Sequence, residues 1–404
     1  MLGTRARRIG VSPTMKVAAE AIKLKAQGVD VVDFGAGEPD FPTPAHVAAA
    51  AHDAIDANFT KYTTNSGTDE LKRAIARRYH DDYGVDYDTS EIIVTAGGKQ
   101  ALFNAVMVLF GDGDEVITHA PGWPTLVEQI KLSDATPVIV RTHQEDGFRL
   151  HADTILRAVT PRTRGIIINS PGNPTGALID EDSLAAVAAE AARQGIWILL
   201  DLCYEKLIYD PTAHNLPAVL ARVHRDRSVI CGSASKTYAM TGWRCGWTIA
   251  PAPVVNACNA LQSHCTSNVA SITQKAAVAA LLGPQECVTG MLEEYRRRRD
   301  QVCAWLAEEP RIRLVKPSGA FYLFPDVSEF LSPDGIRTTA DLAQALLDDV
   351  RVAITPGEAF DAPGFLRLSY ATSMDELRRG TTRILDYLRA LDSSRKPEQV
   401  RVSS

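Results

Sequence analysis

The sequence lacks the features that mark membrane, secreted and nucleic-acid-binding proteins. None of its apolar runs approaches the roughly 18 residues of a spanning helix, and none follows the basic N-terminus MLGTRARRIGVSPTMK as in a secretory signal. The net charge is only −6, from 43 basic and 49 acidic residues, so no positive field would attract nucleic acid or an anionic membrane. We therefore expect a cytoplasmic protein that acts on small molecules.

Cysteine is also used sparingly. The chain has seven cysteines, an odd number, and they never form a C-x-x-C pair. This scatter argues against a disulfide framework and against a zinc or other metal site, and it fits a reducing compartment. The one basic run, YRRRRD at 295–300, has acidic flanks and is typical of a solvated helix face.

What the chain does have is a repeated alternation of short apolar runs and helical patterns. The runs are rich in Val and Ile, and several are apolar throughout, which is typical of strands in a sheet covered on both faces. Alternating strands and helices predict an α/β domain with a mainly parallel, seven-stranded sheet between helices. The expected strands are EIIVTA, EVITHAP, PVIV, GIIINS, GIWILLD, SVICGS and WRCGWTIA.

The pattern changes beyond Leu282. A long charged helix, the strand GAFYLF, a helix near 340–349 and the strands VAITPG and FLRLSY predict a smaller α+β domain. We expect an N-terminal segment at 1–45 that packs with this domain, a large domain at 46–282, the small domain at 283–392 and a disordered tail at 393–404.

Several chemically distinctive residues come directly after the predicted strands. In an open parallel sheet the carboxyl ends of the strands lie along one edge, where ligands bind, so residues that are distant in sequence can converge there. The residues in question are Gly97, Gly98, Lys99, Trp123, Asn173, Asp201, Tyr204 and Lys236.

These residues suggest a particular ligand. The Gly97-Gly98 turn opens a helix and offers backbone N–H groups to a phosphate, which nearby hydroxyl groups and Arg244 would complete. Trp123 offers a stacking face, Asp201 a partner for a protonated ring nitrogen, and Lys236 an amine nucleophile and base. A phosphate, an aromatic ring, a pyridinium partner and a reactive lysine together describe pyridoxal phosphate.

At this point the sequence resembles a known family, the class I aminotransferases of pyridoxal-phosphate fold type I, and within it the bacterial aspartate aminotransferase branch. The similarity runs from about Ser12 to Ala371, and the order and spacing of its motifs are specific. They are GAGEPDFPTP, KYTTNSGTDELKRAI, IIVTAGGKQALFN, APGWP, NSPGNPTGA, DLCYEKLIY, SASKTYAMTGWRCGW, PSGAFYLF and FLRLSYATS.

The resemblance implies catalytic and cofactor-binding roles. Lys236 would hold the cofactor covalently and later move a proton at the substrate Cα, and Asp201 would pair with the pyridinium nitrogen. Asn173 and Tyr204 would bond the phenolic oxygen, and Trp123 would stack on the ring. The residues implied around the phosphate are Gly98, Lys99, Ser233, Ser235 and Arg244, with Tyr62 from the neighbouring subunit of a homodimer.

The resemblance also implies the substrate contacts. Arg367 would clamp the α-carboxylate with help from the backbone at Gly37, and Trp123 and Asn173 would also border the substrate. Lys99 and Thr14 would meet the distal carboxylate of a dicarboxylic substrate. This points to aspartate or glutamate as amino donor and to 2-oxoglutarate or oxaloacetate as acceptor, in a ping-pong reaction.

Each assignment has a simpler structural alternative. The alternative for Lys236 is an ordinary surface lysine after a strand, and the alternative for Trp123 is a tryptophan that fills the core. The alternative for Arg367 is a structural ion pair. The sequence GNPTG is a common turn, and Thr14 is of a type that often caps helices. Their joint occurrence in this order favours the site.

Three departures from the family pattern border the expected site. Leu202 and Cys203 stand between Asp201 and Tyr204 where Glu and an aliphatic residue are common. The loop at 63–67, TTNSG, replaces a loop that usually contains proline, and Gly122 stands where an aromatic residue is often found. These departures leave side-chain specificity open.

Other functions remain compatible with the sequence. An aromatic, kynurenine or prephenate aminotransferase of the same branch would share most motifs, and a pyridoxal-phosphate lyase would share the fold and the cofactor. A ligand-sensing regulator on this fold would need a DNA-binding module, and we expect no room for one before Ser12.

Overall fold

The computed structural model describes residues 10, 13–209, 214–333 and 335–393, with the side chains of 13–18 and 392–393 outside the description. The chain divides into two compact units. The larger unit contains 38–296 and 317–321, and the smaller contains 11–37, 297–316 and 322–404. The tail predicted at 393–404 lies outside the described residues except for Ser393, the last residue of a helix.

The larger unit is built on a seven-stranded sheet in the order β2-β8-β7-β6-β5-β3-β4. Strand β8 is antiparallel to both of its neighbours, and every other pairing is parallel. The predicted mainly parallel sheet is therefore confirmed. The strands are β2 (Ile92–Thr95), β3 (Glu115–Ala120), β4 (Thr136–Arg141), β5 (Thr163–Asn169), β6 (Trp197–Asp201), β7 (Ser228–Ser233) and β8 (Gly246–Ile249).

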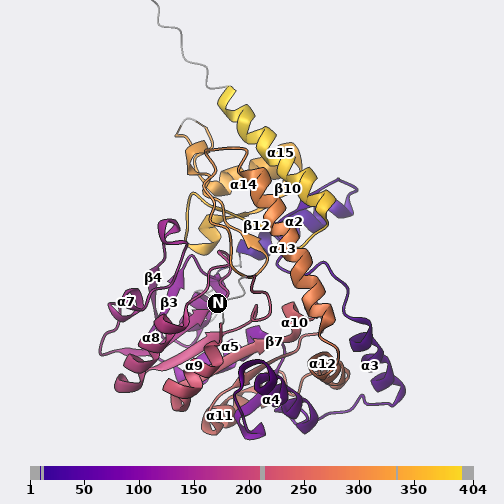
Figure 1. The fold of residues 1–404 in the computed structure, drawn as a ribbon, viewed down its shortest axis with the longest axis vertical. Coiled ribbons are helices and arrows are strands. Elements are labelled where there is room, and N and C mark those ends of the chain that lie inside the picture. The colour runs from indigo at the N-terminus through magenta and orange to yellow at the C-terminus, as the bar shows by residue number, and fades with distance from the viewer. Residues whose placement is uncertain (1–9, 11–12, 210–213, 334, 394–404) are drawn as a thin grey trace, which may run out of the picture. The chain divides into compact units, whose positions relative to one another are not determined.

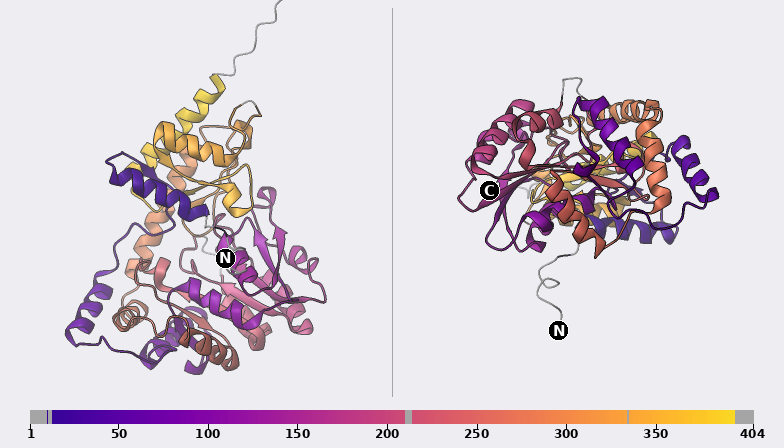
Figure 2. Two further views of the ribbon diagram at one scale, coloured as in Figure 1. Left: turned by 180° about the vertical axis from the view of Figure 1, so that it is seen from behind. Right: turned by 90° about the horizontal axis from the view of Figure 1, so that it is seen from below.

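Helices cover both faces of this sheet (Figures 1 and 2). All residues of β2, β3, β7 and β8 are buried, which explains why these runs are apolar with little alternation. The helices are α3 (Ala45–Asp56), α4 (Asp69–Tyr83), α5 (Gly98–Leu109), α6 (Pro124–Leu132), α7 (Ala152–Leu156), α8 (Glu181–Gln194), α9 (Leu216–Val223), α10 (Ala234–Thr237), α11 (Ala252–Ser263) and α12 (Ser271–Leu282).

Helix α13 (Glu286–Leu306) begins in the larger unit and continues into the smaller one. It carries the basic run predicted to be a solvated face, yet Arg298 and Arg299 are each less than a tenth exposed. That prediction is wrong for these two side chains, because a helix of this length turns part of any four-residue run toward its packed face.

The smaller unit has short strands and longer helices. Strand β1 (Val32–Asp33) pairs in parallel with β10 (Val352–Ala353), and β11 (Thr355–Pro356) and β9 (Tyr322–Leu323) flank β12 (Leu366–Ser369) in antiparallel pairs. The run VAITPG, predicted as one strand, thus forms two short strands in different sheets. The helices are α2 (Pro13–Ala26), α14 (Thr339–Val350) and α15 (Met374–Ser393).

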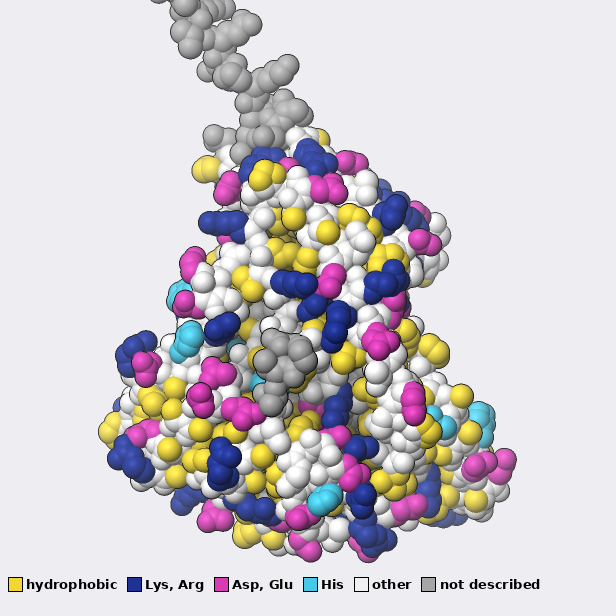
Figure 3. Space-filling view, in the orientation of Figure 1, with side chains coloured by type: hydrophobic (Ala, Val, Ile, Leu, Met, Phe, Trp, Pro, Cys, Tyr) yellow, Lys and Arg dark blue, Asp and Glu magenta, His cyan; other side chains and the backbone are white. Residues whose placement is uncertain are grey.

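The surface agrees with the small net charge. Acidic and basic side chains are interspersed with apolar ones over the face shown in Figure 3. Within the described ranges, no helix has the combined length and apolar character that a membrane crossing requires.

Candidate active site

The turn between β2 and α5 forms a cradle with the end of β7. Gly97 is the N-cap of α5 and has φ of 85°, a conformation that favours glycine. The Ser233 hydroxyl donates to the Ser235 hydroxyl at 2.8 Å and accepts from the Ser235 N–H at 3.1 Å. A Cβ added at Gly98 would stand 3.2 Å from the Ser233 Cβ, so the helix N-terminus and the two hydroxyl groups lie together.

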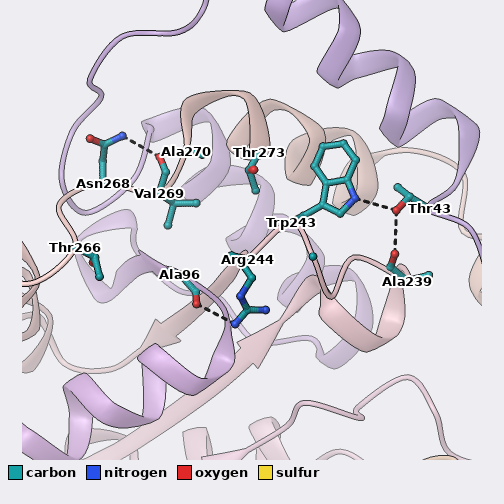
Figure 4. Close-up of a pocket in the computed structure, with 11 residues that line it drawn as sticks. Thr43, Ala96, Ala239, Trp243, Arg244, Thr266, Asn268, Val269, Ala270 and Thr273 are labelled. Atoms are coloured by element: carbon teal, nitrogen blue, oxygen red, sulfur yellow. Dashed lines mark hydrogen bonds between the residues drawn. The ribbon is translucent and has the colours of Figure 1, made fainter. Parts of the chain in front are cut away.

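Arg244 closes the cradle on another side. Its guanidinium donates to the Thr241 carbonyl at 2.7 Å and to the Ala96 carbonyl at 3.2 Å. A Cβ at Gly97 would lie 2.4 Å from Arg244 Nη2, so only glycine allows this approach. Arg244 is solvent-exposed and lines a cavity of about 570 Å³ together with Trp243, Thr43 and Thr273 (Figure 4).

Asp201 ends β6 and is 3% exposed. Burial raises the pKa of its carboxyl group to about 7, opposed by the hydrogen bond from the Cys203 N–H to Oδ1 at 3.0 Å. A carboxyl group in this range can share a proton with a basic ring nitrogen. The Cys203 thiol has a pKa raised to about 12, chiefly by burial, so it is neutral at physiological pH.

Asn173 is held beside the end of β5. Its backbone N–H donates to Asn169 Oδ1 at 2.9 Å, and Asn169 pairs with Asp201 in the register of β5 and β6. Asn173 is 7% exposed. The sheet register therefore brings the GNPTG turn to the strand end that carries Asp201, and Asn169 is the link that sequence reasoning missed.

Lys236 and Tyr204 meet at one aromatic ring. Lys236 Nζ lies 5.8 Å from the centroid of Phe321, and the Tyr204 ring packs edge-on against Phe321 at 5.6 Å. Phe321 is fully buried. It belongs to the larger unit, although the chain on both sides of 317–321 belongs to the smaller unit. It lies in the motif PSGAFYLF, to which sequence reasoning gave no site role.

Lys99 and Trp123 form a second pair at this edge. Lys99 Nζ stands 5.1 Å from the centroid of the Trp123 ring, and Trp123 is the N-cap of α6. Gln129, further along α6, donates to the Lys99 carbonyl at 3.0 Å. Burial and the neighbouring Arg244 charge both lower the pKa of the Lys99 amine.

Arg367 belongs to the smaller unit, on β12. It is 2% exposed, donates to the Gly35 carbonyl at 2.8 Å, and lies over the rings of Tyr322 and Phe360 at 4.5 and 5.1 Å. Tyr322 also touches Gly37, where an added Cβ would lie 3.1 Å from the tyrosine oxygen. The residues predicted to hold the α-carboxylate are thus neighbours within this unit.

Two predicted residues are not brought into these groups. Tyr62 is 92% exposed on the segment between α3 and α4. Thr14 lies in α2, but its side chain is outside the described residues.

Gly122 has a local cause. A Cβ at this position would lie 2.2 Å from the His119 carbonyl oxygen, so the backbone between β3 and α6 accepts no side chain there without moving. The departure at Gly122 therefore reflects the turn's conformation.

Comparison with known proteins shows the family of this chain. The family model described as aminotransferase class I and II matches residues 29–384. The chain belongs to this family. Family members are pyridoxal-phosphate-dependent, and this chain is accordingly a pyridoxal-phosphate-dependent aminotransferase.

Individual relatives cover nearly the whole chain. The aspartate aminotransferase of Geobacillus stearothermophilus is 40% identical over 96% of this chain and 99% of that protein. The aspartate/prephenate aminotransferase of Cereibacter sphaeroides is 42% identical over 93% of this chain and 96% of that protein. A crystal structure of the aspartate aminotransferase from Rhizobium meliloti superposes with a TM-score of 0.91, at 39% identity over 96% of this chain and 99% of that one.

The residues of this aminotransferase fit its cofactor. The helix N-terminus at Gly98 and the paired hydroxyl groups of Ser233 and Ser235 suit a phosphate. The buried Asp201 suits a ring nitrogen that must stay protonated, and the Lys236 amine is the group that can bond an aldehyde.

Proposed function

We propose that this aminotransferase takes the amino group from an acidic amino acid, aspartate or glutamate, and delivers it to 2-oxoglutarate or oxaloacetate. The observation that carries the proposal is the Lys99 amine, which stands over Trp123 at the edge that holds the phosphate cradle. A cation there can pair with a second carboxylate on the substrate. The names of the full-length relatives, aspartate aminotransferases from several bacteria, support the same substrate class.

Each candidate site residue of the larger unit then has a chemical task. When bound, pyridoxal phosphate supplies an aldehyde that captures the amine and a protonated ring that withdraws electrons from the substrate Cα. Asp201 holds the ring nitrogen protonated, Asn173 and Tyr204 donate to the phenolic oxygen, and Trp123 covers the ring. Lys236 attaches the cofactor and then accepts and returns the Cα proton.

The phosphate has its own set of donors. The N–H groups at the start of α5, the hydroxyl groups of Ser233 and Ser235 and the guanidinium of Arg244 would hold it. The Lys99 amine adds a positive charge near the same helix terminus.

Arg367 binds the α-carboxylate that every amino donor carries. Its burial between two rings and its hydrogen bond to Gly35 hold the guanidinium plane fixed, which favours two parallel bonds to a carboxylate. The backbone at Gly37 supports the same group, and Thr14 is proposed to contact the distal carboxylate.

We infer that the enzyme works as a homodimer in which Tyr62 of one subunit reaches the cofactor phosphate of the other. The Tyr62 ring is 92% exposed in a single chain, which leaves it open to contact by a second subunit. A cytoplasmic location is supported by the seven cysteines, all of which are unpaired.

Prephenate is a second candidate substrate. The Cereibacter sphaeroides relative, 42% identical, is named an aspartate/prephenate aminotransferase. Prephenate also carries a second carboxylate, so the Lys99 argument applies to it equally.

The test is the substitution Lys99→Ala, with Lys131→Ala on α6 as the matched surface control. Loss of one charge-assisted bond, about 1.5 to 3 kcal/mol, should lower kcat/KM for aspartate by roughly 10- to 150-fold. Alanine, which has no second carboxylate, should lose less than about threefold. Steady-state kinetics with aspartate, glutamate, prephenate and alanine as substrates measure these losses. Saturating pyridoxal phosphate is present throughout, so that weaker cofactor binding does not contribute. Equal losses for aspartate and alanine would contradict the proposed role.

A further inference from the structure

The segment that carries Tyr62 is tied down although Tyr62 itself is exposed. It connects α3 to α4 and ends at Thr68, whose hydroxyl caps α4 by accepting from the Leu71 N–H at 3.3 Å. An exposed aromatic side chain on a loose loop would sample many positions, and fixing it on binding would cost conformational entropy. The contacts that hold the segment therefore bear on how well Tyr62 is presented.

One buried amide, Gln274 on α12, contacts both ends of the loop that follows Tyr62. Its Oε1 accepts from the Thr68 N–H at 2.8 Å, and its Nε2 donates to the Thr63 hydroxyl at 2.9 Å. The same Nε2 donates to the Val269 carbonyl at 2.8 Å. Gln274 is 1% exposed, and these three bonds give both its oxygen and its nitrogen a hydrogen-bond partner inside the protein.

The three partners lie on two functional segments. Thr63 and Thr68 bracket the loop that begins immediately after Tyr62. Val269 lines the cavity into which Arg244 points (Figure 4). Gln274 is thus a single side chain that joins the Tyr62 loop to the wall of the phosphate-side cavity.

Neighbouring residues of α12 hold the beginning of the same segment. The Ser271 hydroxyl donates to the Phe59 carbonyl at 2.8 Å, and Lys275 Nζ stands 5.1 Å from the centroid of the Phe59 ring. The first turns of α12 therefore fix the chain before Tyr62, at Phe59, and after it, at Thr63 and Thr68. Tyr62 lies between these fixed points.

We propose that Gln274 is a positioning residue for Tyr62, holding the tyrosine where it meets the cofactor phosphate of a second copy of the chain. The inference rests on the proposed function, in which Tyr62 acts across the dimer. In this proposal Gln274 acts on cofactor binding through Thr63, Thr68 and the loop between them, so its effect requires the Tyr62 hydroxyl.

The experiment measures the dissociation constant of pyridoxal phosphate from the dimeric apoenzyme by equilibrium dialysis. Gln274→Met removes all three bonds with little change in volume, and Thr63→Val removes only the bond to the Thr63 hydroxyl. Gln285→Met is the matched control. Its Oε1 accepts from the Tyr238 hydroxyl and its Nε2 donates to the Ala280 and Gly283 carbonyls, and none of these three partners lies in the Tyr62 loop.

The expected result is about tenfold weaker cofactor binding in Gln274→Met and about threefold weaker binding in Thr63→Val, since each loosens the loop to a different degree. Gln285→Met should bind the cofactor like wild type even though its melting temperature falls. In a Tyr62→Phe background, Gln274→Met should weaken binding no further, because the two residues act as one unit.

Three results would overturn the inference, and they distinguish it from the proposed function. If Tyr62→Phe weakens binding but Gln274→Met does not, or if their effects add, Gln274 does not act through Tyr62 and the proposed function stands. If Tyr62→Phe leaves the dissociation constant unchanged, the proposed role of Tyr62 fails and the inference falls with it. Thr63→Val keeps the test valid should Gln274→Met prove too unstable to isolate.

Discussion

Each of the two units has an arginine among its candidate site residues, and the two arginines differ in exposure to solvent. Arg244, in the larger unit, is exposed and lines an open cavity, and its guanidinium is held by the carbonyls of Thr241 and Ala96. Arg367 is 2% exposed, lies over two aromatic rings and donates to the Gly35 carbonyl.

The difference follows from what each arginine is proposed to bind. A phosphate carries its charge on several oxygens and can be held by many donors, including a helix N-terminus, so no single donor needs to be buried. A lone α-carboxylate has fewer contacts, and a buried, fixed guanidinium gives the most directional pair. In the proposed function, the larger unit distributes cofactor binding over several strands, and the smaller unit concentrates carboxylate recognition in one residue.

The largest expected effect is on the larger unit. Lys236→Ala should reduce kcat by at least roughly 10²- to 10⁴-fold, because it removes the amine that moves the Cα proton. It should also abolish the visible absorbance that the lysine-bound cofactor gives. Absorption spectra and stopped-flow turnover measure both. A variant that retained turnover and the same spectrum would remove Lys236 from the reaction.

The matching change in the smaller unit is Arg367→Ala. Loss of a buried charged partner should cost about 3 kcal/mol in kcat/KM, or roughly 10²-fold, for every amino donor alike. The cofactor spectrum should remain unchanged, since cofactor residues lie in the other unit. Arg311→Ala is the control, because Arg311 also stands over a ring, that of Phe330 at 4.4 Å, but on a different part of the smaller unit. A loss confined to dicarboxylic donors would contradict the assignment.

The smallest effect concerns a second carboxyl group close to Asp201 in sequence. Glu205 accepts from the Tyr83 hydroxyl at 2.8 Å and the Tyr79 hydroxyl at 3.4 Å, and burial raises its pKa to about 7 from a usual 4.5. A carboxyl group with a raised folded-state pKa contributes stability that is present below pH 4.5 and is lost as the pH rises through about 7. This group is proposed to be structural, in contrast to Asp201.

Glu205→Gln should therefore flatten the pH dependence of stability. Between pH 5 and 8 the wild-type apoprotein should lose roughly 2 to 3 kcal/mol more free energy of unfolding than the variant. Urea denaturation at the two pH values measures this difference. Cofactor affinity should not change, and identical pH slopes in both proteins would show that the Glu205 carboxyl group is not held neutral.

Much of the fold could be predicted because buried parallel strands leave a strong local signal. All seven strands of the large sheet were expected from short Val- and Ile-rich runs. The strands of the smaller unit were harder to predict from the sequence. Strands β10 and β11 have two residues each, too short for any periodicity, so the run VAITPG gave no sign that it serves two sheets.

The candidate site shows the same limit. The residues after strands β2, β5, β6 and β7 could be expected at one edge, because the ends of parallel strands share it. Phe321, which contacts both Lys236 and Tyr204, could not, because it reaches the larger unit from a distant part of the chain. Gln274 carries no local signal either, since a glutamine in a helix is ordinary until its partners are known.

By itself, the sequence determined the α/β class and the strand ends after which Lys236, Asp201 and the other candidate site residues lie, because periodicity and residue type are local properties. Only the tertiary structure decided which side chains touch. The raised pKa of Asp201, the ring shared by Lys236 and Tyr204, and the burial of Arg367 all depend on contacts between segments far apart in the chain. Such contacts fix solvation and distance, and no single stretch of sequence encodes them.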